Sequence, residues 1–126
     1  MSNYNHRSSR LIIWYDAHAY EQGHASTREL LESHLGDVFI MNDKTEWQRL
    51  IGRDHSSQRL VLIISGQFGR EIVPRIHDSP NIVSIYVYCQ DRERNREWAK
   101  NYSKVKSVHT TLDELISDII FDPNNN

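Results

Sequence analysis

The chain has 126 residues, of which 38% are apolar and 25% charged, so it is long enough for one compact domain with a substantial core. A formal net charge of −2 excludes a general electrostatic attraction to nucleic acid or anionic lipid. The single cysteine, Cys89, excludes an internal disulfide and suits a reducing compartment. The longest apolar run is too short to span a membrane, so we expect a cytoplasmic protein.

Both ends of the chain lack the pattern of a helix or a strand. We therefore predict a disordered N-terminal segment over residues 1–10, a single α/β domain over residues 11–120 and a disordered tail over residues 121–126. Polar ends of this kind are typical of a module that belongs to a longer protein, which is what we expect here.

The first half of the domain alternates between apolar runs and helical patterns. Residues 11–15 predict the first strand, and Asp16 follows it directly. A polar loop then leads to a helix that we expect to begin with a capping box at Ser26. Residues 37–41 predict the second strand, and a second capping motif, at Asp43, predicts the start of the next helix.

The third strand is the centre of the pattern. Residues 60–64 are all apolar, which predicts that helices cover both faces of the sheet. After Ser65 and Gly66, apolar residues recur every four positions, as on one face of a helix. Pro74 lies inside that helical pattern and cannot donate to the carbonyl of Arg70, so we expect a kink or a late helix start.

Two further strands and two further helices complete the domain. Residues 82–88 are β-branched and aromatic and predict the fourth strand, which a charged helix follows from Asp91 or Asn95. Residues 104–109 predict a fifth strand whose alternating lysines are typical of a sheet edge. A third capping box, at Thr111, predicts the start of the last helix.

Five strands that alternate with five helices predict an α/β fold with three layers and a doubly wound, five-stranded parallel sheet. We expect the strand order 2-1-3-4-5 of flavodoxin-like folds. In that order the topology changes direction between strands 1 and 3, and ligands bind at the carboxyl ends of the strands there. The residues predicted to bind a ligand or cofactor at this point are Asp16, His18, Ser65, Gly66 and Gln67.

Two chemistries known on similar folds do not fit this pattern. Receiver domains carry a phosphate-accepting aspartate at the end of strand 3, where this chain has Ser65. Caspase-like proteases need a histidine as the base for a cysteine. This chain has Ser65 at the histidine position, and only 23 residues lie between Ser65 and Cys89. We therefore interpret Cys89 as a packing residue.

The turn after strand 3 and the histidines of the first loop give weaker signals. Gly66 and Gly69 would let backbone N–H groups approach an anion, but no nucleotide-binding glycine motif is present. Asp16, His18 and His24 match no standard metal spacing, so we predict no metal site. A nucleotide at the switch point stays open as an alternative.

Two segments of the pattern carry a family resemblance. They are the first strand with its polar end, Leu-Ile-Ile-Trp-Tyr-Asp16, and the third strand with its turn, Leu-Val-Leu-Ile-Ile-Ser-Gly-Gln-Phe68. In these the chain resembles TIR-type signalling domains, over roughly residues 11–120. Other segments, around residues 61–77 and 84–89, are similar to the N-terminal module of large invertebrate multidomain proteins with repeat or ADP-ribosyltransferase regions.

The resemblance implies a non-catalytic signalling and interaction module that binds protein partners, its own copies among them, and needs no cofactor. The alternative that it implies is a nucleotide-binding or NAD-cleaving enzyme. The NAD-cleaving members of the family use a glutamate on the helix after strand 3, and Glu71 is the acidic residue in that region. The enzyme hypothesis therefore requires Glu71 to point into the switch-point crevice. A plain structural domain of a longer chain is the third hypothesis.

Overall fold

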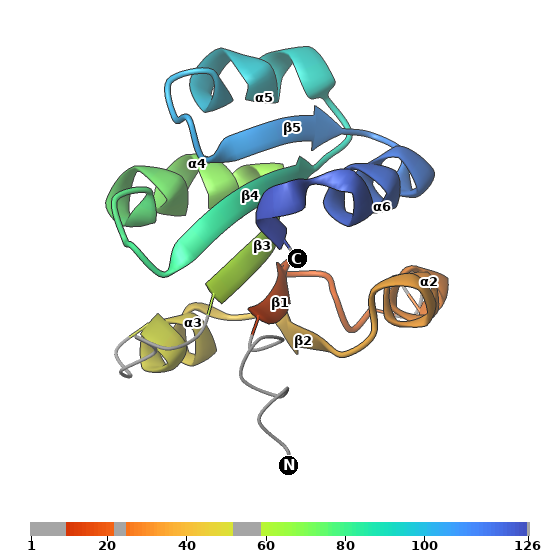
Figure 1. Cartoon of the computed structure of the whole chain (residues 1–126). Coiled ribbons are helices and arrows are strands. Elements are labelled where there is room, and N and C mark those ends of the chain that lie inside the picture. The colour runs from red at the N-terminus through yellow and green to blue at the C-terminus, as the bar shows by residue number, and fades with distance from the viewer. Residues whose placement is uncertain (1–9, 22–24, 52–58, 126) are drawn as a thin grey trace.

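The computed structural model describes residues 10–21, 25–51 and 59–125 (Figure 1). The strands are β1 (Arg10–Tyr15), β2 (Val38–Met41), β3 (Arg59–Ser65), β4 (Ile82–Tyr88) and β5 (Val105–His109). The helices are α2 (Ala25–Leu35), α3 (Lys44–Ile51), α4 (Gly66–Ile76), α5 (Arg92–Ala99) and α6 (Leu112–Phe121), and a short 3-10 helix, η2 (Pro123–Asn125), follows α6.

The strands form one parallel sheet in the order β2-β1-β3-β4-β5, which confirms the predicted flavodoxin-like fold class. Strand β1 pairs with β2 on one side and with β3 on the other. Helices α2 and α6 cover one face of the sheet, and α3, α4 and α5 cover the other (Figure 1). The chain thus changes its direction of travel across the sheet between β1 and β3.

The apolar strands are explained by burial on both faces. In β1, Ile12 and Trp14 belong to the core beneath α2 and α6, while Ile13 and Tyr15 belong to the core beneath α3, α4 and α5. All four side chains are at most 2% exposed. Because each such residue stabilises the fold by about 2 kcal/mol, neither face of the strand can be polar.

Three helices start where the sequence predicts, and one does not. Asp43 accepts a hydrogen bond from the N–H of Glu46 (2.9 Å), as a capping residue should. Asp91 caps α5 in the same way. The capping box predicted at Ser26 is wrong, because α2 already begins at Ala25. The start predicted at Thr111 is confirmed, because Thr111 stands at the N-cap of α6, but its side chain makes no capping bond.

Helix α4 starts immediately after the third strand. It begins at Gly66, so a late start caused by Pro74 is excluded. Pro74 lies in the last turn of the helix, which ends at Ile76, and its side chain is exposed. Pro74 has no N–H, so the carbonyl of Arg70 loses its helical partner, and this loss lies one turn before the four carbonyls that end the helix.

The structure at the end of the chain differs from the disordered tail predicted over residues 121–126. Phe121 is still part of α6, and η2 places Asn125 in the interior, 0% exposed. The Asn125 amide donates to Tyr86 Oη (2.8 Å) and to the carbonyl of Ile119 (2.9 Å), and its oxygen accepts from Ser84 Oγ (2.6 Å). At the other end, Arg10 belongs to β1, and the rest of the predicted segment 1–10 lies outside the described residues.

We predict that Asn125→Ala lowers the free energy of unfolding by about 2 to 4 kcal/mol, because it leaves the buried hydroxyls of Ser84 and Tyr86 without the amide that bonds them. Urea unfolding followed by circular dichroism measures this. The matched control is Asn124→Ala, because the Asn124 side chain is exposed and the bonds of this residue with Arg59 and Asp122 are made by its backbone. Equal stability of the two variants would contradict the prediction.

A second prediction concerns alkaline pH. Burial, aided by the negative charges of Asp43 and Glu71, raises the pKa of Tyr15 from 10.0 to about 12, and burial raises that of Tyr86 to about 12. As the pH rises, the phenols of Tyr15 and Tyr86 lose their protons in the unfolded chain before they do so in the folded chain. The contribution of each ring to the free energy of unfolding is therefore fully present below pH 10. It is lost between pH 10 and 12, by about 2 kcal/mol for each ring.

Tyr15→Phe tests this by urea unfolding at several pH values. The variant should lose stability less steeply above pH 10 than the parent chain does. At pH 7 it should be at least as stable, because Tyr15 Oη has no hydrogen-bond partner among the residues that the structure describes. The same alkaline slope in both proteins would show that Tyr15 does not contribute.

Candidate functional site

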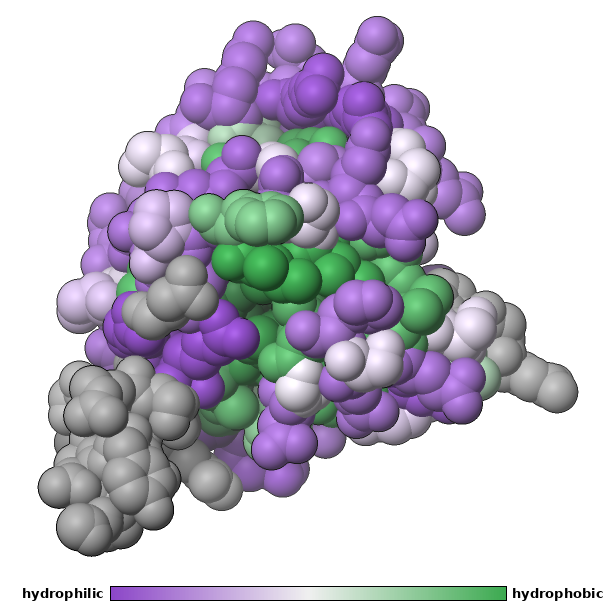
Figure 2. All heavy atoms as spheres, turned by 45° about the vertical axis from the view of Figure 1, so that its right-hand side comes forward, coloured by the Kyte–Doolittle hydropathy of each residue, from purple (hydrophilic) through white to green (hydrophobic). Residues whose placement is uncertain are grey.

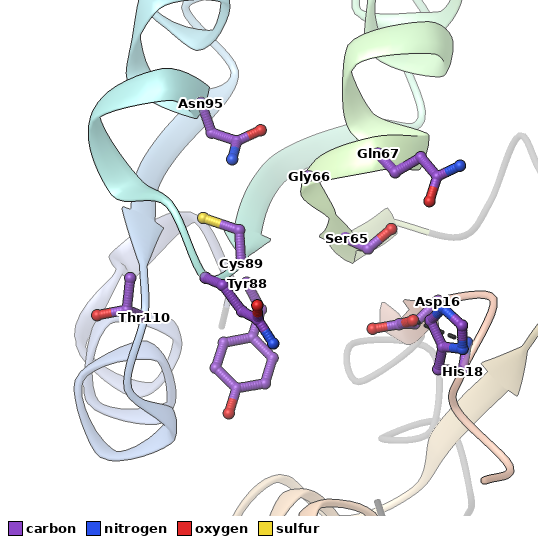
Figure 3. A pocket seen from close by; sticks show the side chains of 10 residues that line it. Asp16, His18, Ser65, Gly66, Gln67, Tyr88, Cys89, Asn95 and Thr110 are labelled. Carbon is purple, nitrogen blue, oxygen red and sulfur yellow. Dashed lines mark hydrogen bonds between the residues drawn. The ribbon is translucent and has the colours of Figure 1, made fainter.

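A hollow of about 730 Å³ opens at the carboxyl ends of β1, β3 and β4 (Figure 3). Its lining is mostly polar and consists of Asp16, His18, Ser65, Gly66, Gln67, Tyr88, Cys89, Gln90, Asn95 and Thr110. All five residues predicted to bind a ligand or cofactor are in this lining. The structure thus brings together Asp16 and His18, which follow β1, with the residues that end β3 and begin α4.

Asp16 lines the hollow on the side of β1. This residue is only 8% exposed, and its N–H donates to the carbonyl of Met41 (3.0 Å). One carboxylate oxygen accepts from the N–H of His18 (2.9 Å). The His18 ring is exposed, and its hydrogen bond with the Glu21 carboxylate raises the pKa of the imidazole. Asp16 therefore presents a fixed acceptor to the hollow, and His18 lies at its rim.

The opposite edge is the start of α4. Ser65 caps the helix by accepting from the N–H of Phe68 (3.3 Å), so the chain turns from strand to helix within one residue. A Cβ at Gly66 would lie 2.6 Å from Asn95 Oδ1, so only glycine allows α4 to approach α5 this closely. The N–H groups of the first turn and the helix dipole favour a negatively charged ligand group here.

Asn95 forms the wall opposite Gly66. It is 7% exposed, its amide donates to the carbonyl of Asp91 (2.8 Å), and its oxygen accepts from Trp98 Nε1 (2.9 Å). These bonds make it a structural part of α5 that also faces the hollow. In Figure 3 it lies across the open space from Asp16 and His18.

Tyr88 and Cys89 form the floor at the end of β4. Burial, with a smaller contribution from the negative charge of Asp16, raises the pKa of Tyr88. Burial also raises the pKa of the Cys89 thiol, and its Sγ contacts the carbonyl of Asp91 (3.5 Å). Because the thiol stays protonated at neutral pH, Cys89 is not an activated nucleophile.

The charged and polar side chains of the lining indicate which ligand groups the hollow can bind. Asp16 supplies an acceptor for hydroxyl or amino donors, and the amides and hydroxyls around it can bond polar groups of either kind. An adjoining hollow shares Gly66, Gln67 and Asn95 and adds two positive residues, Arg70 and Arg94, and one negative residue, Asp91. Positive charge therefore lies beside the start of α4. Among the residues described, no group of three or more His, Cys, Asp or Glu side chains could hold a metal ion.

Glu71 does not lie in this hollow. It is one helical turn beyond Gln67, about 6 Å farther along the axis of α4, and it lines a separate groove between α3 and α4. Its carboxylate pairs with Lys44 Nζ (2.7 Å), and this hydrogen bond lowers the pKa of Glu71. Glu71 and the five predicted ligand-binding residues therefore line separate hollows.

The sequence does not predict the other five lining residues as site residues, namely Tyr88, Cys89, Gln90, Asn95 and Thr110. They follow or end β4 and β5, or lie on α5, whereas the switch-point rule points only to β1 and β3. The carboxyl ends of all parallel strands meet at one edge of the sheet. The polar residues just after the fourth and fifth predicted strands could therefore have been included.

Comparison of the chain with protein-family models, with curated proteins and with solved structures gives no match. None of the helices in the described part of the chain has the length and apolar character needed to cross a membrane.

We predict that Gly66→Ala lowers the free energy of unfolding by about 1 to 3 kcal/mol, because the added methyl group displaces Asn95 and breaks its bond to Trp98. Urea unfolding measures the loss, and a shift of the Trp98 indole N–H resonance reports the broken bond. Gln67→Ala is the control, since this neighbouring side chain is exposed. An unchanged indole resonance in Gly66→Ala would contradict the prediction.

Proposed function

We propose that this domain is a cytoplasmic signalling module, TIR-like in kind, that binds a nucleotide or nucleotide-derived ligand in the switch-point hollow without cleaving it. One observation carries the proposal. The five residues predicted from the topology rule line a single polar hollow, whereas Glu71, on which cleavage would depend, is paired with Lys44 elsewhere.

The ligand class follows from the lining. A hollow of about 730 Å³ is within the usual range of small-molecule sites. Asp16 would accept hydrogen bonds from ribose hydroxyls or from an amino group of the base. The start of α4 and the neighbouring Arg70 and Arg94 would attract phosphate. NAD and ADP-ribose combine these features in one molecule.

Association with proteins is the second function that we propose, and exposed apolar side chains favour it. Phe121 is 79% exposed, Tyr20 55% and Phe39 46%. Aromatic residues at the surface are enriched in protein interfaces. A signalling module would need both properties, a site that reads a ligand and a surface that transmits the result.

The test is a titration of the protein with NAD and ADP-ribose, followed by NMR chemical shifts and by analysis of products. We expect saturable shifts at Ser65, Gly66 and Gln67 and no product. Asp16→Asn should weaken binding about tenfold or more, because it removes the charged acceptor.

Glu71→Gln is the matched control, since it also neutralises one carboxylate but lies outside the hollow, and its affinity should equal that of the parent chain. A product that disappears in Glu71→Gln would replace our proposal with the enzyme. No shifts at millimolar ligand would remove the ligand function and leave association alone.

A further inference from the structure

Strand β5 lies at one edge of the sheet, and among the described residues it pairs with β4 alone. The carbonyl of His109 accepts from the N–H of Cys89 (2.9 Å), so it points toward β4. Neighbouring residues of a strand direct their backbone groups to opposite sides, so the N–H and C=O of Val108 point away from β4. The edge thus offers a donor and an acceptor to a further strand.

A groove of about 440 Å³ follows this edge between β5 and α5, and we call it the β5-edge groove. It is lined by all five residues of β5, whose side chains point to both faces of the sheet, so it runs along the strand edge rather than over one face. Ala99 and Val108 are 4% and 5% exposed and give the groove an apolar floor. Figure 2 shows hydrophilic side chains around α5, at the top of the view, with apolar atoms recessed below them.

Part of the charge along the groove is already balanced within the chain. Lys100 pairs with Glu97 (3.2 Å). His109 lies between Asp118 (2.6 Å) and Glu114 (3.7 Å). These side chains supply little net attraction for a charged partner, because each of them already has a group of opposite charge beside it.

Two cations of the groove have no ion pair among the described residues. They are Arg96 and Lys106, and both side chains are exposed. The lining residues all belong to the described part of the chain, and among them Glu97 is the one carboxylate, which Lys100 already neutralises. The adjoining hollow toward α6 shares Arg96 and adds the carboxylate of Asp113, which lies outside the groove. The unpaired charge of the groove itself is therefore positive.

Lysines at a sheet edge discourage pairing with a further strand, but in β5 this protection is incomplete. Lys104 Nζ donates to the carbonyl of Ser79 (2.6 Å), so it is held against the turn that precedes β4. Lys106 and Arg96 remain at the edge, where they repel a basic strand and attract an acidic one. A second copy of this chain does not fit edge to edge, because two β5 strands would bring these like charges together.

An extended peptide suits the groove better than a nucleic acid does. The outward N–H and C=O of Val108 match the alternating acceptor and donor of another backbone, whereas a phosphate group offers acceptors only. The apolar floor at Ala99 and Val108 suits an aliphatic side chain. The chain as a whole has a formal net charge of −2, which disfavours a polyanion.

We propose that the β5-edge groove binds an extended acidic segment of another protein, which joins the sheet as a further strand beside β5. The backbone of this segment bonds Val108, an aliphatic side chain of it lies on Ala99, and its carboxylates lie beside Arg96 and Lys106. This binding rests on the protein association proposed above, for which it supplies a surface and a partner, and it needs no ligand in the switch-point hollow.

Titration with a blocked hexapeptide that alternates glutamate and valine is the first test, followed by NMR chemical shifts and amide hydrogen exchange. We expect saturable shifts at Lys106, Ser107 and Val108, and slower exchange of the Val108 N–H because the added strand accepts a hydrogen bond from it. The affinity should fall when salt is added. A peptide with lysine in place of glutamate should bind about tenfold more weakly or worse, and so should one whose N-methylated valines cannot donate.

Reversed charges in the groove test the electrostatic part. Arg96→Glu and Lys106→Glu should each weaken binding of the glutamate peptide about tenfold. Arg49→Glu is the matched control, because it makes the same change of charge at an exposed residue of α3 outside the groove, and its affinity should equal that of the parent chain. All three substituted side chains are exposed, so circular dichroism should show that the variants are folded.

Three results would overturn the proposal. The first is an absence of shifts along β5 at millimolar glutamate peptide, and the second is an unchanged affinity in both groove variants. The third is a single-stranded DNA hexamer that binds the same residues more tightly than the peptide does, which would make the groove a nucleic-acid site. Association with a protein that Phe121→Ser abolishes and the groove variants keep would overturn this inference but not the association function.

The titration with NAD gives a separate readout, since its shifts are expected at Ser65, Gly66 and Gln67. Failure of the peptide to bind therefore leaves the result for the ligand unchanged.

Discussion

The divergence of the chain after β1 and β3 is the constraint on which the functional part of this structure depends. These strands are neighbours in the sheet, yet the helix that follows β1 packs on one face and the helix that follows β3 packs on the other. Two helices that leave in opposite directions cannot fill the space between their starting points. A hollow is therefore left where Asp16 and Ser65 lie.

The opposite wall of the hollow depends on close contact between α4 and α5. Gly66 faces Asn95, and a Cβ at Gly69 would lie 2.8 Å from the ring of Trp98. Two glycines one turn apart thus let α5 pack directly against the backbone of α4. The hydrogen bonds of Asn95 with Asp91 and Trp98 fix its side chain between the two helices. The same side chain faces the hollow.

The parts of the fold that depend on burial were predictable, and the parts that depend on individual side-chain directions were not. Residues 60–64 predict a central strand because both of its faces are buried. The strand order with its switch point is expected because five strands alternate with five helices, as in flavodoxin-like folds. The direction of Glu71 depends on the residue at which α4 begins. Pro74 left that start uncertain, and only the capping bond at Ser65 places it at Gly66.

The end of the chain was mispredicted for a different physical reason. A run of asparagines is typical of disorder, since asparagine has little apolar surface to bury. Asn125 is ordered because its amide meets Ser84 and Tyr86, two buried hydroxyls that are contributed by a strand about forty residues earlier. No local pattern could reveal that contact. Its consequence is the fixed position of Phe121 at the end of α6.

Helix α4 lines both the switch-point hollow and the groove between α3 and α4 that holds Glu71. Its first turn lines the switch-point hollow, and Ile72 and Arg75 farther along line the groove. A ligand alters association only if it binds differently to two arrangements of the protein. Because Gly66 and Gly69 pack against α5, a ligand that moved α4 would have to move α5 with it. Helix α5 also lines the β5-edge groove. Any coupling between the hollow and that groove would therefore involve these two helices as one unit, and a rigid pair would leave ligand binding and association independent.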